Sequence, residues 1–270
     1  MKFTTFYFSG TGNTKWVVEE FDKIVINTLN DSEIISIESI DNNNFSFLIE
    51  KIKNSDFIGF ANPIYGGNIP PIMLTFIKNL IKMVENENIA IKPVYIINTF
   101  AYVNGFGPFC AKKLFKKSCF KIISYINIRL GNNISLPNFR VKLTDKAILN
   151  KRKNIAIENL ISSVDLILKG KKKISGIGPY LIPNILIRKK SIIAIKNNYN
   201  VLSINCDTCS RCMKCVNSCP TKSIKYENNS FSFLSSCTAC MRCYNNCHSY
   251  SILFQGKYVD PDLYERYHGI

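Results

Sequence analysis

Short apolar runs and longer helix-like stretches alternate along residues 1–169. This alternation is typical of βαβ units, in which parallel strands are joined by helices that cover the sheet. Strands are predicted over residues 2–8, 33–37, 56–62, 91–98 and 120–128. Helices are predicted near residues 13–28, 45–54, 70–83, 105–117 and 144–169. The first part of the chain is therefore expected to be an α/β domain built on a doubly wound, parallel, five-stranded sheet.

The cysteines mark a second unit. The chain has eleven, of which Cys110 and Cys119 stand alone and the other nine lie between Cys206 and Cys247. We predict an α/β domain over 1–169, a connector over 170–200, a small α+β cysteine-rich domain over 201–256 and a C-terminal tail over 257–270. Because no signal peptide is evident, so many cysteines favour metal or redox chemistry over disulfides.

The charge balance of the chain indicates which class of partner it is expected to bind. The chain carries 35 basic and 19 acidic residues, a formal net charge of +16, and the segment 170–200 holds seven of the basic and none of the acidic ones. This argues for partners that bring negative charge, such as redox proteins with acidic surfaces. Nucleic acid is not expected, because no groove-reading motif accompanies the charge. With only two His and no evident carboxylate pair, no catalytic residue is assigned.

Neither the N-terminal segment nor the most apolar later stretch predicts a membrane protein. The N-terminal MKFTTFYF runs into a Gly-rich turn without a cleavage site, so it is interpreted as a buried first strand and not as a targeting segment. The most apolar late stretch, 180–195, is broken by Pro183 and by three basic residues, which leaves no run of ~18 apolar residues. We predict a cytoplasmic protein without a transmembrane span. The connector 170–200 either packs across both domains or touches a membrane surface peripherally.

A Gly-rich turn follows the first predicted strand and opens a helix. It reads Ser9-Gly10-Thr11-Gly12-Asn13-Thr14. At a helix N-terminus, its amides and hydroxyl groups present donors to a dianion, whereas an ordinary N-cap would explain one hydroxyl and not three. The turn is not a Walker A motif, which needs Gly-Lys-Ser/Thr. It is not G-x-G-x-x-G either, because Lys15 stands where the third Gly would fall.

The run FYFSGTGNT resembles the phosphate loop of flavodoxins, and the resemblance covers roughly the first 170 residues. It implies a flavodoxin-like fold and a non-covalent flavin mononucleotide (FMN) held by Ser9, Gly10, Thr11, Gly12, Asn13 and Thr14. Two later loops, 62–67 and 98–107, fall where this fold places the flavin ring. From them we predict the further FMN-binding residues Pro63, Ile64, Tyr65, Gly66, Thr99, Phe100, Ala101, Gly105 and Phe106.

The aromatic residues of these two loops differ in how strongly the sequence favours their contact with the flavin. Tyr65 is expected to stack on the flavin ring, whereas Tyr102 and Phe106 fit flavin contact and simple loop cover equally well. Many stand-alone flavodoxins carry an acidic loop around the ring. This chain has few carboxylates there, so the resemblance does not extend to the redox tuning of the flavin.

The last domain carries a repeated cysteine motif. Its first copy is Cys209, Cys212, Cys215 and Cys219, followed by Pro220, and its second copy, 28 positions later, is Cys237, Cys240, Cys243 and Cys247. Both have the spacing C-x2-C-x2-C-x3-C. In the bacterial [4Fe-4S] pattern, three Cys of a motif bind one cluster and the fourth binds the other. We therefore predict Cys209, Cys212, Cys215 and Cys247 for one cluster, and Cys237, Cys240, Cys243 and Cys219 for the second.

Structural zinc is the alternative for such cysteines, but it usually separates two pairs by a dozen or more residues. The spacing and the aligned segments CPTKSIKY and CHSYSILF resemble dicluster bacterial ferredoxins, over roughly residues 201–256. His248 replaces the Pro that usually follows the last Cys, and it is either a plain exposed side chain or a titratable group near a cluster. Cys206, Cys110 and Cys119 are predicted to be free thiols.

Together the two units resemble the flavodoxin/ferredoxin fusion proteins of anaerobic bacteria. The resemblance implies an electron-transfer protein that passes electrons between FMN and two [4Fe-4S] clusters, and to or from redox partner proteins. Joining the two units keeps donor and acceptor at high effective concentration. An FMN-dependent reductase of a small substrate is the alternative. A redox-sensing protein whose basic segment binds nucleic acid or anionic lipid is a third hypothesis.

Overall fold

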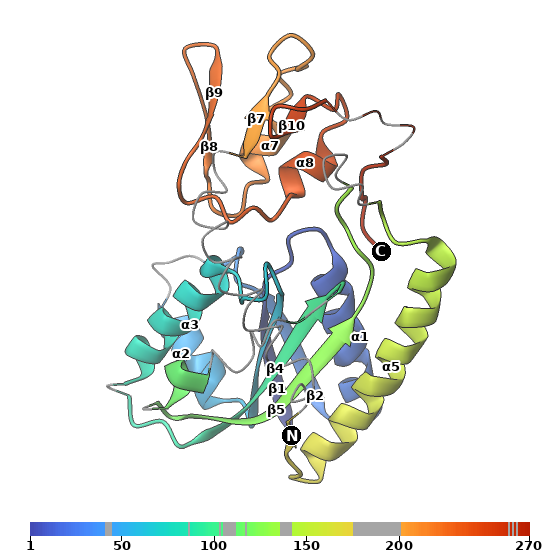
Figure 1. The fold of residues 1–270 in the computed structure, drawn as a ribbon. Coiled ribbons are helices and arrows are strands. Elements are labelled where there is room, and N and C mark those ends of the chain that lie inside the picture. The colour runs from blue at the N-terminus through green and yellow to red at the C-terminus, as the bar shows by residue number, and fades with distance from the viewer. Residues whose placement is uncertain are drawn as a thin grey trace.

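The structure, a computed structural model, describes residues 1–40, 45–85, 87–102, 104, 112–116, 118–135, 142–174, 201–258, 260, 262 and 264–270. The predicted FMN residues Gly105 and Phe106, the predicted free thiol Cys110 and the connector beyond residue 174 lie outside this part of the chain. In Figure 1 the described residues form a larger part with a central sheet and a smaller part, coloured orange to red, above it.

The larger part is built on a parallel sheet. Its strands are β1 (Lys2–Tyr7), β2 (Asp31–Ser36), β3 (Phe57–Pro63), β4 (Lys92–Phe100), β5 (Phe120–Arg129) and β6 (Lys173–Ile174). They lie side by side in the order β2-β1-β3-β4-β5-β6, and every pair is parallel. The first five have the flavodoxin-like order 2-1-3-4-5, which confirms the predicted fold class. β6 adds a sixth strand that the pattern does not predict, because a two-residue strand leaves no apolar run.

Helices cover both faces of this sheet (Figure 1). One face carries α1 (Asn13–Asn27) and α5 (Lys146–Leu168), and the other carries α2 (Phe45–Lys53) and α3 (Pro71–Val84). Since strand side chains alternate between the faces, each strand feeds two cores. Phe6 and Phe60 pack with α2 and α3, whereas Phe3 and Tyr95 pack with α1 and α5. Of the helix predicted near 105–117, residues 112–115 are helical, while 105–111 and 117 lie outside the described chain.

The small domain folds as two similar halves. Its elements are β7 (Leu202–Ile204), α7 (Lys214–Asn217), β8 (Ile224–Glu227), β9 (Ser230–Phe233), α8 (Arg242–Asn246) and β10 (Ile252–Phe254). β7 pairs with β10 and β8 with β9, both antiparallel. Left-handed backbone recurs 28 positions apart, at Arg211 and Ala239 and at Met213 and Met241. Residues with a side chain rarely adopt it, so its repetition shows that the two cysteine loops share one shape.

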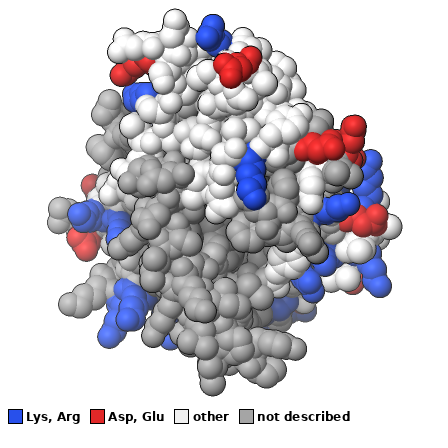
Figure 2. Space-filling view, turned by 45° about the horizontal axis from the view of Figure 1, so that its top comes forward, with Lys and Arg blue, Asp and Glu red and all other residues white. Residues whose placement is uncertain are grey.

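The small domain stands over the carboxyl ends of the sheet strands (Figure 1). It has its own core, formed by residues such as Leu202, Ile224, Tyr244 and Ile252. Figure 2 shows the described Lys and Arg side chains mostly around the margins of the face in view, with Asp and Glu among them. In the described ranges, no helix is both long and apolar enough to cross a membrane.

Candidate functional site at the domain interface

The strand ends and the small domain enclose a pocket of about 350 Å³, within the ~300–1,000 Å³ of common small-molecule sites. Twelve of the fifteen predicted FMN residues line it: Ser9, Gly10, Thr11, Asn13, Thr14, Pro63, Ile64, Tyr65, Gly66, Thr99, Phe100 and Ala101. Gly12 lines a second cavity instead, and Gly105 and Phe106 are not among the described residues. The three predicted loops therefore meet at one place.

The pocket also has walls that were not predicted from the sequence. The segment after β5, Gly131, Asn132, Asn133 and Ile134, lines it. Tyr102, for which flavin contact and loop cover were equally expected, lines it too. Four residues of the small domain line it as well, namely Thr238, Ala239, Met241 and Phe254. Three of these four flank Cys240, so the second cysteine loop is itself a wall of the pocket.

Hydrogen bonds within the turn hold the phosphate loop in shape. The Ser9 hydroxyl accepts the backbone N–H groups of Gly12 and Lys15, both at 3.2 Å, and so caps the start of α1. Gly12 has φ +107°, a conformation that suits glycine. The Thr11 hydroxyl accepts a hydrogen bond from the Asn133 side-chain amide, which leaves its own O–H free to donate.

Side-chain hydrogen bonds also tie the loop to the sheet. The Thr14 and Thr99 hydroxyls lie 2.7 Å apart, and both residues are buried. Further in, the Asn62 amide donates to Asn98, and Asn98 donates to Asn127, each at 3.3 Å. These three Asn are neighbours in register on β3, β4 and β5. They join the strand ends directly before the loops that line the pocket.

Tyr65 reaches from the loop after β3 to the second cysteine loop. Its hydroxyl oxygen is buried and has no hydrogen-bond partner among the described residues. Burial raises the pKa of this hydroxyl, and the neighbouring Cys240 raises it further. A Cβ at Gly10 would lie 2.2 Å from the Tyr65 oxygen and 3.0 Å from the Cys240 carbonyl oxygen. A glycine is therefore required where Tyr65 and Cys240 close over the phosphate loop.

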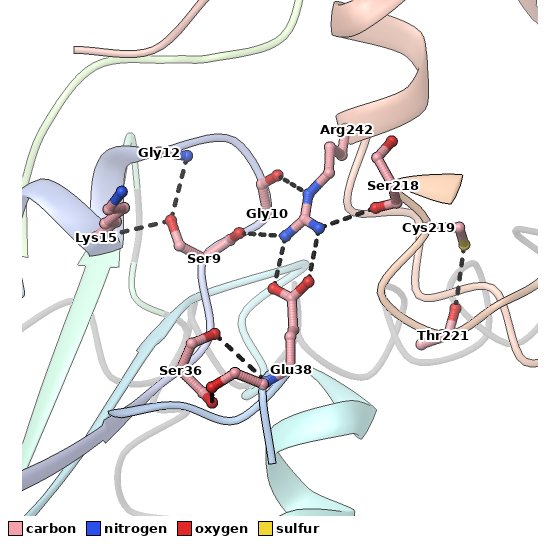
Figure 3. Close-up of polar contacts among 11 residues, drawn as sticks. Ser9, Gly10, Gly12, Lys15, Ser36, Glu38, Ser218, Cys219, Thr221 and Arg242 are labelled. Atoms are coloured by element: carbon pink, nitrogen blue, oxygen red, sulfur yellow. Dashed lines mark hydrogen bonds and ion pairs between the residues drawn. The ribbon is translucent and has the colours of Figure 1, made fainter. Parts of the chain in front are cut away.

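Helix α8 docks the small domain on the first one. The Arg242 guanidinium forms a two-pronged ion pair with Glu38, which follows β2, at 2.6 Å (Figure 3). The Tyr244 hydroxyl donates to the carbonyl oxygen of Ser135 at 2.9 Å. The Asn245 side-chain amide donates to the carbonyl oxygen of Asn133 at 3.1 Å.

The C-terminal tail joins the two domains a second time. The Tyr267 N–H donates to the Asn245 side chain at 3.3 Å, and the Tyr267 hydroxyl donates to the Asn13 side chain in the phosphate loop. Ile270 packs against the core between the sheet and helices α1 and α5. The phosphate loop thus contacts both the cysteine-rich domain and the C-terminal tail.

The thiols predicted for the first cluster gather around one cavity. It is lined by Cys209, Cys212, Cys215 and Cys247, and also by Cys243 of the other set. Burial raises the pKa of Cys215, and the thiols of Cys209, Cys247 and Cys212 raise it further. Cys247 thereby lies beside the first motif, although it belongs to the second.

The thiols predicted for the second cluster are more deeply buried. Burial raises the pKa of Cys240 to about 11, with Cys219 and Cys237 adding to the effect. Burial also raises the pKa of Cys243, as do Cys240, Cys237 and Cys219. Cys219 comes from the first motif and lies beside three thiols of the second. The structure therefore places the fourth Cys of each motif near the other motif's loop.

Backbone N–H groups point at these sulfur atoms in both halves. The N–H of Arg211 lies 3.4 Å from the Cys209 sulfur, and the N–H of Ala239 donates to Cys237. Hydroxyls repeat in the same way, with Thr221 3.7 Å from Cys219 and Ser249 3.5 Å from Cys247. Soft thiolates with amide donors suit iron–sulfur clusters. In the described part of the chain, no three His, Cys, Asp or Glu side chains gather closely enough to hold one metal ion.

A buried arginine lies next to the first set of thiols. Arg266 is only 3% exposed, and its guanidinium carbon lies 3.4 Å from the centre of the Tyr244 ring. One nitrogen donates to the Ile252 carbonyl oxygen at 3.3 Å, and the other two have no hydrogen-bond partner among the described residues. Burial lowers the pKa of Arg266, against the effect of Tyr244 and Cys247. A buried cation with unpaired donors needs a nearby negative charge, and a cluster bound at Cys247 would supply it.

The other described thiols lie apart from these sets. Cys206 is exposed and Cys119 is half-buried, and neither is in a disulfide. Burial raises the pKa of Cys119. His248 lies on the surface, with one ring nitrogen 3.2 Å from the Ser210 hydroxyl.

Two interface residues that were not predicted from the sequence can be recognised by comparing the two halves of the cysteine repeat. Arg242 and Tyr244 stand at positions where the first half has Lys214 and Val216. The flanking cysteines are the same in both halves. The differences therefore indicate that the second half, besides carrying its cysteines, contacts another part of the protein. The segment after β5 leaves no comparable signal, because a short polar turn is typical of any strand end.

The strand order and the cysteine loops together define a chain in which a flavodoxin-like domain is joined to a ferredoxin-type domain. A protein-family model described as a 4Fe-4S dicluster domain matches residues 202–248. No curated protein matches the chain.

Several solved structures resemble this chain. A flavodoxin from the domain Archaea is 15% identical with a TM-score of 0.40, covering 61% of this chain and 99% of that one. The two-electron reduced flavodoxin of Megasphaera elsdenii is 14% identical with a TM-score of 0.43, covering 60% and 98%. Rubredoxin oxygen:oxidoreductase of Desulfovibrio gigas is 10% identical with a TM-score of 0.41, and the match covers 62% of this chain and 37% of that protein. The fold assignment rests on the strand order itself.

Proposed function

We propose that this chain transfers electrons between an FMN bound in the interdomain pocket and two [4Fe-4S] clusters bound by the small domain, and exchanges them with redox partner proteins. When bound, these groups supply the redox chemistry, because iron–sulfur clusters pass single electrons and a flavin accepts one or two. The observation that carries the proposal is the pocket wall formed by Thr238, Ala239 and Met241. These residues belong to the loop of Cys237 and Cys240, so one loop serves both sites.

The residues present fit FMN. The phosphate loop offers backbone N–H groups and the Thr11 hydroxyl at the N-terminus of α1, where negative charge is favoured. The buried Thr238 hydroxyl lines the pocket and has no partner among the described residues, so it can donate to a polar edge of the ring. Tyr65 supplies an aromatic face, and Gly66 and Gly67 allow close approach of the backbone.

The eight cysteines fit two clusters. We assign Cys209, Cys212, Cys215 and Cys247 to the first, and Cys237, Cys240, Cys243 and Cys219 to the second, because Cys247 lines the cavity of the first motif's thiols and Cys219 acts on Cys240 and Cys237 of the second motif. Thiols with pKa values raised by burial stay protonated at neutral pH until a metal displaces the proton. The second set lies nearer the flavin pocket, since its loop lines that pocket. The first set is more exposed at Cys212 and is the natural point of exchange with a partner.

Partners with acidic surfaces suit the overall charge of +16. We place the protein in the cytoplasm, where reduced thiols and iron–sulfur clusters persist. The connector 170–200 remains the candidate for contact with both domains or with a membrane surface.

Anaerobic purification followed by cofactor analysis tests the proposal. We expect one FMN and about eight iron and eight sulfide per chain, as two four-iron clusters require. Roughly four iron, or bound zinc, would contradict the ligand assignment. Rapid mixing of the reduced protein with a ferredoxin and with small acceptors then separates the two functions. Fast oxidation by the ferredoxin alone supports a carrier, whereas turnover of a small acceptor at enzyme-like rates supports the reductase.

A further inference from the structure

Arg242 of the small domain enters the first domain beside the phosphate loop (Figure 3). Its Nε donates to the Gly10 carbonyl oxygen at 2.9 Å, and Nη2 donates to the Ser9 carbonyl oxygen at 2.7 Å. Both Nη atoms bind the Glu38 carboxylate, and Nη1 also donates to the Ser218 carbonyl oxygen at 2.9 Å. A guanidinium has five N–H groups, so this site uses all of them.

Arg242 does not act on a bound phosphate through net charge. The side chains of Arg242 and Glu38 are 18% and 23% exposed, and together they form a neutral pair. An arginine guanidinium is not deprotonated in proteins. The guanidinium therefore stays charged and stays bound to Glu38. Its effect on the loop must come through the two carbonyl groups that it holds.

Those carbonyl groups determine where the loop's amides point. They belong to the peptide units that link Ser9 to Gly10 and Gly10 to Thr11. In a trans peptide the C=O and N–H groups point in opposite directions, and the described chain has no cis peptide. Because both carbonyl oxygens face Arg242, the N–H groups of Gly10 and Thr11 face away from it. Gly10 and Thr11 line the flavin pocket, and both also line the neighbouring cavity that Arg242 lines.

We infer that Arg242 is a positioning residue for the phosphate loop, so that the second cysteine loop sets the affinity for the FMN phosphate. This inference rests on the proposed function, since it concerns the same flavin site. Arg242 lies between Cys240 and Cys243, and the shape of the cysteine loop is thereby linked to that of the phosphate loop. Such coupling is reciprocal, so bound FMN also stabilises the cysteine loop.

The repeat provides a matched control. Lys214 occupies the position of Arg242 in the first half, again between two cysteines of its motif, and it is exposed. The ammonium group of a lysine lacks the planar, forked shape with which the Arg242 guanidinium binds several acceptors at once. Substitution of Lys214 therefore changes a charge beside the other cysteine loop without touching the phosphate loop.

The test compares R242Q, R242K and K214Q with the unchanged full-length chain, all with clusters assembled anaerobically. FMN and riboflavin are titrated into each protein by fluorescence quenching, and iron is measured in every sample. Riboflavin lacks the phosphate, so it reports on the pocket without the phosphate contacts. We expect R242Q to bind FMN at least ~10-fold more weakly, within the usual range of coupling between sites, and to bind riboflavin as before. R242K should recover only part of the loss, and K214Q should bind both flavins normally.

Equal FMN affinity in R242Q and the unchanged chain would overturn the inference, and so would equal losses for FMN and riboflavin. If R242Q loses iron, R242K carries the comparison, because it keeps the charge and lacks the fork. An unchanged chain that binds no FMN would overturn the proposed function together with this inference. FMN binding that does not depend on Arg242 would overturn the inference alone.

Discussion

At the scale of single residues, each set of four thiols assigned to one cluster combines three cysteines of one sequence motif with the fourth cysteine of the other motif. Cys219 follows the first motif's loop and yet raises the pKa of Cys240 and Cys243. Cys247 follows the second loop and raises the pKa of Cys215. Each cluster is therefore expected to depend on both halves of the small domain.

Cysteine substitutions test this crossed arrangement. Cys219→Ala is expected to remove the cluster of the second loop and leave about four iron, because one motif supplies the fourth ligand of the other cluster. The electron paramagnetic resonance spectrum that remains after reduction should match the spectrum of Cys237→Ala and differ from that of Cys215→Ala. The control is Cys206→Ala, which removes an exposed thiol and should keep all the iron. A Cys219→Ala spectrum that matches Cys215→Ala would contradict the crossed assignment.

Arg266 offers a second test at this scale. Its buried guanidinium lies near Cys247, and two of its nitrogens have no hydrogen-bond partner among the described residues, so it should stabilise the more negative, reduced state of the first cluster. Arg266→Met is therefore expected to lower that cluster's reduction potential, by about 59 mV for each tenfold change in the one-electron equilibrium. A potentiometric titration followed by electron paramagnetic resonance measures the change. Lys225→Met, at an exposed position on β8, is the control for loss of charge alone, and an equal shift in both variants would refute the role of Arg266.

At the scale of elements, the sheet and the cysteine loops follow from local patterns, and the docking helix does not. The predicted strand 56–62 corresponds to β3 (Phe57–Pro63), because a strand buried on both faces is a continuous apolar run. The contact of Arg242 with Glu38 joins residues 204 positions apart. No local pattern encodes such a pairing, and only the divergence of Arg242 from Lys214 within the repeat points to it.

The contact of the loop after β3 with the phosphate loop can be tested by a double-mutant cycle. Gly10→Ala would place a methyl group 2.2 Å from the Tyr65 oxygen, and we expect a loss of ~1–3 kcal/mol in stability from overpacking, together with weaker FMN binding. Tyr65→Phe should cost little, since its hydroxyl has no described partner. The double variant should recover part of the Gly10→Ala loss, incompletely because the Cys240 carbonyl oxygen is 3.0 Å away.

Thermal unfolding and FMN titration of the four proteins give the coupling energy. Residues in contact usually couple by ~0.5–3 kcal/mol, whereas distant residues are additive. Strict additivity of Gly10→Ala and Tyr65→Phe would show that the two residues do not meet.

At the scale of the whole molecule, the pocket belongs to neither domain alone. Its walls come from three strand ends, the segment after β5, the second cysteine loop and Phe254. The tail returns from the small domain to Asn13. The domains could be recognised from the sequence because each carries its own motif, but their relative placement could not, since it depends on contacts of α8 and the tail with distant residues.

Removal of iron tests the link between the two halves. Chelation under reducing conditions should free the second cysteine loop and weaken FMN binding in the unchanged chain, because coupling between two sites acts in both directions. The same treatment should have a smaller effect on R242Q, in which the link is already broken. Titration of FMN before and after chelation measures both effects, and an iron-free chain with undiminished FMN affinity would contradict the link.

The central claim is that flavin and clusters exchange electrons within one chain. Flash photoreduction of the fully loaded protein, followed by absorbance at flavin and cluster wavelengths, measures this exchange directly. Because donor and acceptor are held in one molecule, the rate should stay the same on dilution of the protein by about tenfold. A rate that falls in proportion to protein concentration, or clusters that never equilibrate with the flavin, would contradict the account.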